Sequence, residues 1–189
     1  MDFDIAQSKL SESAQRVVDR ALEECRRREH GLLTNEHIFL AFAQADWDTF
    51  SQVMRDLELN PHEILHGLEE HLRALPTLSG GEPCIAPETK LVFKLSVLQA
   101  SRAGRQTVDS SDLFCAIFEE SQGVPVSLIR RYGVEPEVLV ARIATRTHEN
   151  ELRGGAPSEA VRAAGHAQAV RDESESARPT GQDRPGPWP

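Results

Sequence analysis

Apolar residues recur every three or four positions in short stretches along most of the chain, the spacing that gives an α-helix one buried face. The first stretch carries Ala14, Val17, Val18, Ala21, Leu22 and Cys25, with Ser11 placed to cap its start. A denser run of Ile38, Phe39, Leu40 and Phe42 follows, entered through Thr34 and Asn35. Two more stretches hold Phe50, Val53, Met54 and Leu57, then Ile64, Leu65, Leu68 and Leu72 after Pro61. No strand-like alternation competes, so the pattern predicts four short helices.

The same pattern returns without a gap in the second half of the chain, which indicates an internal repeat. The repeat register is the constant shift that brings Val17 onto Val92, Phe39 onto Phe114, and Pro61 onto Pro136. Most other matches in this register are conservative, such as Ile38 with Leu113 and Leu68 with Ile143. The shared apolar phase over about 60 positions carries this inference more than the few identities do.

The second copy therefore predicts four further helices. The first opens at Ala86-Pro87, where proline suits the first helical turn, and the second is entered through Ser110. The third carries Val126, Leu128, Ile129 and Tyr132, and the last carries Val138, Leu139 and Ile143 after Pro136. The fold class is all-α, with two repeats at about 10–75 and 85–150 joined by the linker 76–87.

Beyond about residue 152 the composition changes. Residues 153–189 are rich in Gly, Ala, Ser and Pro, and their five arginines balance five acidic residues. Their large apolar residues are few: Val161, Val170 and Trp188. Such a segment cannot offset the entropy of its own ordering. We expect a folded domain at 1–152 and a disordered linker or tail at 153–189.

Charge and composition exclude several classes of function. A formal net charge of −9 argues against nucleic acid as the main partner, because phosphate binding needs clustered basic residues. No apolar run approaches the roughly 18 residues of a membrane span. The acidic N-terminus does not resemble a signal peptide. The three cysteines are far apart and form no C-x-x-C, so we expect no disulfide or zinc framework and a cytoplasmic protein.

The sequence around the second helix resembles a known family. Leu10-Ser11-x-x-Ala14, then Thr34-Asn35-Glu36-His37 before an apolar helix, then a second copy in the repeat register, is similar to the N-terminal (double Clp repeat) domain of the AAA+ unfoldases ClpA, ClpC and ClpB. The resemblance covers roughly residues 3–150. It implies two pseudo-twofold-related four-helix repeats that dock adaptors or substrates for an ATPase ring. The chain has no G-x-x-x-x-G-K-[ST] nucleotide loop of its own.

Glu36 and His37 are the first candidate site. General acid–base catalysis would need a nucleophile or an orienting group that the motif lacks. The structural interpretation is that Glu36 complements the helix dipole and His37 packs or caps. The resemblance adds a third, because the glutamate of this motif in ClpC-like domains helps to recognise phosphorylated arginine, and a carboxylate suits a guanidinium.

The second copy departs from this motif. Ser111-Asp112 stands where Glu36-His37 stands in the first, so a two-site phosphoarginine reader is not expected unless Asp112 reaches the same face. This loss resembles ClpA, whose N-terminal domain docks a ClpS-type adaptor. We expect protein docking, with the partner surface near Thr34, Asn35, Glu36 and His37 and near Ser110, Ser111 and Asp112.

A second motif offers an enzymatic alternative. His62-Glu63-x-x-His66 formally matches the H-E-x-x-H helix of zinc peptidases. Its third ligand would have to come from downstream, where only His148 and His166 follow His71. At the matching positions of the second repeat, Glu137 and Ala141 replace the two histidines, which favours a surface histidine face over a metal site.

The sequence thus predicts a docking module without catalysis, cofactor or metal. Its expected partners are a ClpS-type or other adaptor, protein substrates that include arginine-phosphorylated ones, and a Clp ATPase. Two alternatives stay open. A free-standing chain could act as a decoy or regulator that binds the same adaptors or small ligands, and residues 62–66 could form a zinc metallopeptidase site.

Overall fold

The computed structural model describes residues 9–78, 81–119 and 123–154. The chain divides into two units, Met1–Asn150 and Glu151–Pro189, and the duplicated helices belong to the first except for the last residues of α9. Of the tail predicted at 153–189, everything from residue 155 onward lies outside the described residues.

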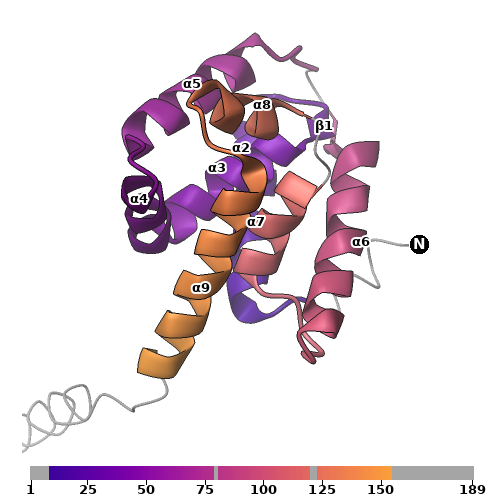
Figure 1. The fold of residues 1–189 in the computed structure, drawn as a ribbon. Helices are drawn as coiled ribbons and strands as arrows, with labels where there is room; N and C mark the ends of the chain where they lie inside the picture. Colours follow the sequence, from indigo (N-terminus) through magenta and orange to yellow (C-terminus); the bar gives the residue numbers. More distant parts are fainter. Residues whose placement is uncertain (1–8, 79–80, 120–122, 155–189) are drawn as a thin grey trace, which may run out of the picture. The chain divides into compact units, whose positions relative to one another are not determined.

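The described residues form eight helices in two sets of four (Figure 1). The first set is α2 (Glu12–Arg27), α3 (Asn35–Ala45), α4 (Trp47–Asp56) and α5 (Pro61–Ala74). The second set is α6 (Pro87–Arg102), α7 (Ser110–Glu119), α8 (Val124–Arg131) and α9 (Pro136–Gly154). In the repeat register both ends of α2 fall on those of α6, and the starts of α3 and α5 fall on those of α7 and α9. The all-α fold and its repeat are confirmed.

Local signals fix most helix starts as the sequence predicts. Ser11 caps α2 by accepting the Ala14 amide, and proline opens α5, α6 and α9. The second helix of the second repeat is entered through Ser110, which is the first residue of α7. The carbonyl of Asp109 accepts the first helical bonds, from Asp112 and Leu113.

The structure also contains two short strands that the sequence did not predict. β1 (Leu32–Leu33) pairs in parallel with β2 (Cys84–Ile85), joining Leu33 to Ile85 across the repeats. An isolated parallel bridge joins Leu10 to Val108. The repeat register matches Leu10 to Ile85 and Leu33 to Val108, so the two pairings are equivalent. In each repeat, the residue two positions before the first helix therefore pairs with a residue of the other repeat. The two repeats are related by an approximate twofold axis.

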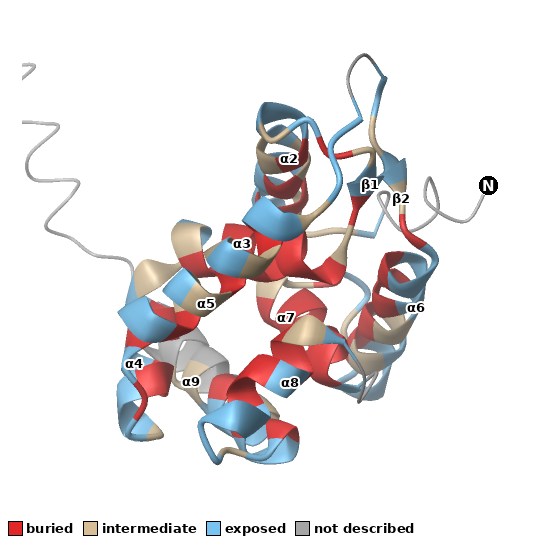
Figure 2. Cartoon of the chain, turned by 90° about the horizontal axis from the view of Figure 1, so that it is seen from above, coloured by how far each residue is buried: buried red, intermediate tan, exposed pale blue. Residues whose placement is uncertain are grey.

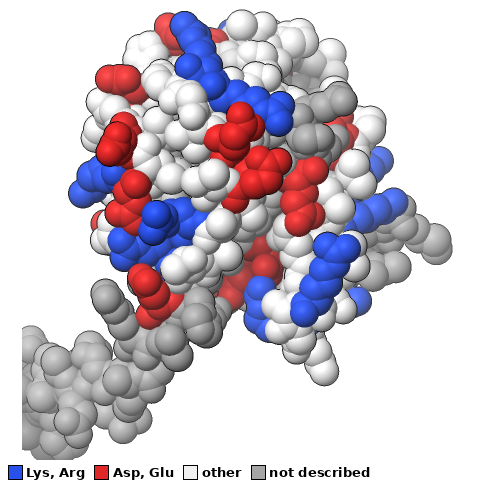
Figure 3. Space-filling view, in the orientation of Figure 1, with Lys and Arg blue, Asp and Glu red and all other residues white. Residues whose placement is uncertain are grey.

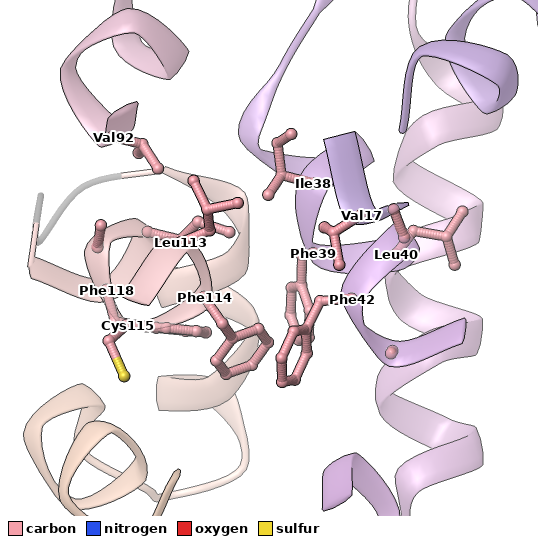
Figure 4. Close-up of a cluster of buried hydrophobic side chains, with 14 of the residues drawn as sticks. Val17, Ile38, Phe39, Leu40, Phe42, Val92, Leu113, Phe114, Cys115 and Phe118 are labelled. Atoms are coloured by element: carbon pink, nitrogen blue, oxygen red, sulfur yellow. The ribbon is translucent and has the colours of Figure 1, made fainter. Parts of the chain in front are cut away.

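The core lies where α3 and α7 meet, and in Figure 2 the buried stretches run along these two helices. Phe39 and its counterpart Phe114 contact each other edge to face, with ring centroids 5.1 Å apart (Figure 4). Phe42 lies 4.3 Å from Phe114 by the same measure. The equivalent helices of the two repeats thus share one aromatic core, so neither repeat can bury its apolar face alone.

A few apolar positions differ from the prediction. Val138 is 51% exposed and Tyr132 is 39% exposed, although both were assigned to helix core faces. Cys25 and Cys115 are buried and Cys84 is exposed. Within the described part of the chain, no helix is both long enough and apolar enough to cross a bilayer.

Candidate functional site

The start of α3 is built around His37, which is fully buried. Thr34 precedes the helix in extended conformation, and its backbone N–H donates to His37 Nδ1 at 3.1 Å. In return, the Thr34 side chain accepts from the backbone N–H of His37. The two contacts form a capping box in which histidine replaces the usual glutamate. The prediction that His37 packs and caps is confirmed.

His37 also contacts a second buried imidazole. Because its Nδ1 accepts a hydrogen bond, its Nε2 carries the proton and donates to His30 Nδ1 at 2.8 Å. Burial, and then the nearby charges of His30 and Arg28, lower the pKa of His37 to about 4, although Glu24 opposes this. Burial and Arg28 also lower the pKa of His30. Both rings are therefore neutral at pH 7.

The start of α7 has the same geometry with different chemistry. Asp112 occupies the position of His37, and its Oδ2 accepts from the backbone N–H of Asp109 at 2.8 Å. Arg105 occupies the position of His30 and binds Asp112 in bidentate fashion, at 2.7 and 2.6 Å. A charged pair thus replaces a neutral one. Asp112 turns back on its own helix start and therefore does not substitute for Glu36.

Glu36 lies in the first turn of α3, and its side chain is 11% exposed. Its Oε1 is 3.9 Å from Nε2 of His71 on α5, which is 36% exposed. Ser111, the matching residue of α7, is also buried. The structure therefore has an acidic group at the edge of the first repeat and a hydroxyl at the same place in the second.

The remaining predicted site residues hold helices together. Asn35 Oδ1 accepts from Thr89 Oγ1 at 2.9 Å, which joins α3 to α6. The backbone N–H of Ser110 donates to Ser13 Oγ at 3.3 Å, which joins α7 to α2. Of the seven residues, Thr34 and Ser110 are half-buried and the other five are buried. Their burial ties the site closely to the stability of the fold.

Sequence reasoning missed a polar groove beside Ser110. It has a volume of about 460 Å³ and lies between α2, the end of α3 and the start of α7. Arg16, Arg20 and Glu23 line it from α2, and Arg20 Nε donates to Gln44 Oε1 at 2.8 Å. The sequence does contain a signal for this groove, because these three charged residues recur at i, i+4 and i+7 on a helix whose other face is apolar.

The three histidines of α5 do not converge. The ring of His62 packs against Trp47 with centroids 5.0 Å apart, and His66 lies 3.7 Å from Glu70. His71 faces Glu36 instead. Among the residues that the structure describes, no group of three or more His, Cys, Asp or Glu side chains could hold a metal ion. The side chains of His148 and His166, the third ligands that the zinc peptidase hypothesis considered, lie outside the described residues.

Comparison with known proteins decides the family. The model of the Clp repeat (R) N-terminal domain matches residues 9–132, which is most of the chain. The chain belongs to the Clp repeat N-terminal domain family. The match covers the first repeat and the second repeat as far as residue 132, so α9 lies beyond it.

Individual relatives agree with this assignment. The chloroplastic ClpA homologue of Brassica napus, an ATP-binding subunit of Clp protease, is 22% identical over 142 residues, which is 75% of this chain but 16% of the relative. This chain thus spans about a sixth of the length of that relative.

Solved structures share the fold. The N-terminal domain of Hsp104 from Candida albicans has a TM-score of 0.65 at 12% identity, covering 71% of this chain and 89% of its own. A ClpV N-domain in complex with a VipB peptide has a TM-score of 0.62 at 16% identity, covering 76% and 90%.

Proposed function

We propose that this chain is a non-catalytic docking module that holds adaptor proteins or substrate segments for a Clp-type AAA+ unfoldase. The observation that carries the proposal is membership of the Clp repeat family, in which a ClpV N-domain of the same fold has been solved with a peptide. The sequence contains no nucleotide-binding loop of the G-x-x-x-x-G-K-[ST] type. The module would therefore supply recognition, while the energy for unfolding would come from an ATPase ring.

The docking surface that we propose includes the starts of α3 and α7. Thr34 and Ser110 are the least buried of the candidate residues. Thr34 immediately precedes α3, and Ser110 is the first residue of α7. Glu36 offers a carboxylate at the edge between α3 and α5. A partner that reaches this edge would meet His71 first, because His71 is the more exposed of the two.

Binding of phosphorylated arginine is less well supported. The side chain of Glu36 is only 11% exposed and lies beside His71, and the second repeat offers Ser111 instead of a carboxylate. Asp112 is already held by Arg105 and by the amide of Asp109. We therefore favour a ClpS-type adaptor, as in ClpA, over a phosphoarginine reader with two sites.

Calorimetric titration of the whole chain separates these two partners. The chain is titrated with a ClpS-type adaptor and, separately, with phosphoarginine. We expect saturable heat with the adaptor, weakened about tenfold by Glu36→Ala if Glu36 lies in the interface. The control is Glu137→Ala, which removes an exposed carboxylate at the start of α9, outside the proposed surface. Absence of any saturable binding to the adaptor would contradict the docking proposal in this form.

The phosphoarginine titration has its own outcome. Saturable binding that Glu36→Ala abolishes and Ser111→Ala leaves unchanged would establish a reader that uses one repeat. A degradation assay with a full-length Clp ATPase and its adaptor then separates delivery from competition. A chain that only sequesters the adaptor or a small ligand would slow degradation in proportion to its concentration.

A further inference from the structure

The outer face of α6 carries an apolar stripe. Leu91 is 42% exposed and Leu98 is 44% exposed, and half-buried Leu95 lies between them. Their i, i+4, i+7 spacing puts all three on one side of the helix over about 10 Å. The opposite side of α6 is buried through Val92 and Phe93. The helix is therefore apolar on both faces, and on the outer face Leu95 also packs against the core while Leu91 and Leu98 are exposed.

The first repeat shows that the fold does not require leucine at these positions. The equivalent residues of α2 are Arg16, Arg20 and Glu23, which line the polar groove described above. The two helices have the same length and the same place in their repeats. A single exposed leucine is ordinary, but three in a line, where the twin helix carries charges, indicate a contact surface.

The stripe has a positively charged border. Lys90, Lys94 and Arg102 are exposed on α6, against one exposed acid, Glu88. Two of the three lysines of a chain with net charge −9 therefore lie beside this stripe. In Figure 3 basic side chains lie over α6 among uncharged surface. A partner that covers the leucines would gain from acidic residues at its own border.

We propose that the outer face of α6 binds an amphipathic helix of a partner protein. The apolar stripe of that helix packs on Leu91, Leu95 and Leu98, and its acidic border faces Lys90 and Lys94. Exposed Leu91 and Leu98, with half-buried Leu95 between them, match the anchor spacing of a single docked helix. A second copy of this chain fits less well, because a twofold contact would bring lysines to lysines, and a stable dimer buries about 800 Å² per partner.

This surface is separate from the helix starts proposed for adaptor docking. Its residues lie on the solvent side of α6, whereas Thr34, Glu36 and Asp112 belong to the starts of α3 and α7. Glu36→Ala should therefore leave helix binding at α6 unchanged. Failure of one proposal is thus distinguishable from failure of the other.

The test uses the full chain and a fluorescently labelled synthetic helix of about 18 residues, with leucine at i, i+4 and i+7 and glutamate along both borders. Fluorescence anisotropy measures its affinity. We expect saturable binding that the double variant Leu91→Ser, Leu98→Ser weakens about tenfold or more. The control is Leu32→Ser, Leu78→Ser, which removes two leucines that are more exposed, at 50% and 65%, elsewhere on the surface. Urea unfolding checks that both variants fold.

The role of the charged border is tested by reversing the charges on the peptide and on α6. A peptide with lysine borders should bind weakly to the natural chain and regain affinity with Lys90→Glu, Lys94→Glu. Equal loss in the stripe variant and its control would overturn the proposal. Binding that appears only after deletion of residues 1–8 would assign the stripe to the chain's own N-terminus. A dimer that Leu98→Glu dissociates would assign it to a second copy, and each result would overturn the partner proposed here.

Discussion

Histidine holds in the first repeat the position that aspartate holds in the second. His37 and Asp112 both accept a backbone N–H from the residue before their helix, at 3.1 and 2.8 Å. The side chains that bind them differ too. His30 contacts His37, whereas Arg105, at the equivalent position of the second repeat, binds Asp112. The first helix start therefore depends on a neutral pair and the second on a charged one. The two repeats should respond differently to pH.

Acidification should destabilise the fold through His37. Its pKa in the folded chain is lowered to about 4 by burial, His30 and Arg28, so the unfolded chain binds the proton first. The stabilisation is complete above about pH 6.5 and is lost as the pH falls towards 4, by about 3 kcal/mol in all. The lowered pKa of His30 acts in the same direction. Urea unfolding between pH 7.5 and 4.5 measures this slope.

His37→Gln supplies the variant for this measurement. Glutamine can keep the capping box with Thr34 but cannot titrate, so the pH slope should become shallower while the fold persists. The control is His66→Gln, which removes a histidine whose side chain is 67% exposed. An unchanged slope in His37→Gln would show that His37 does not carry the pH dependence.

At the level of elements, the repeat register predicted the helices well because the signals are local. Proline at the first helical position and apolar spacing within one segment fix α5, α6 and α9. The strands were missed because each has two residues, too few for an alternating pattern, and each pairs with a strand from the other repeat. The pairing of Arg105 with Asp112 could have been sought, since both stand in register with histidines.

The candidate site was predicted less completely than the fold. The sequence placed Glu36 and Ser111 at equivalent positions, but it could not show that His71 approaches Glu36 from another helix. It could not show the direction of Asp112 either, because that depends on Arg105 and on the turn before α7. Side-chain orientation follows from tertiary contacts that periodicity does not report.

The starts of α2 and α7 are tied together by Asp109. Its carboxylate accepts the hydroxyls of Ser11, at 2.6 Å, and of Ser13. Burial alone would raise the pKa of this carboxyl, but the two hydroxyls, with help from Arg105 and the Ser110 amide, hold it below its ordinary value. With the Leu10–Val108 bridge, this contact joins one repeat to the other.

Asp109→Ala should therefore cost more than loss of an ordinary helix cap. We expect about 2 kcal/mol of unfolding free energy, against about 1 kcal/mol for Thr34→Ala at the equivalent start of α3. Urea unfolding compares the totals, and amide hydrogen exchange should show faster opening at the starts of both α2 and α7. Equal costs, with exchange raised only in α7, would contradict the inter-repeat role.

At the scale of the whole molecule, the two repeats fold as one body because they share the Phe39–Phe114 core and exchange pairing residues. This leaves the helix starts and the outer face of α6 as separate surfaces on a single frame. Such a frame suits docking, because recognition at one surface need not disturb the other. The differences between the repeats, rather than their common fold, would then determine what the chain binds.

Hydrogen exchange of the full chain, followed by mass spectrometry with and without a ClpS-type adaptor, tests the docking account most directly. We expect slower exchange at the starts of α3 and α7, near Thr34–His37 and Ser110–Asp112, at saturating adaptor. Residues of α4, remote from these starts in sequence, serve as the internal reference. Unchanged exchange throughout residues 9–154 under conditions that saturate a full-length ClpA would contradict the account.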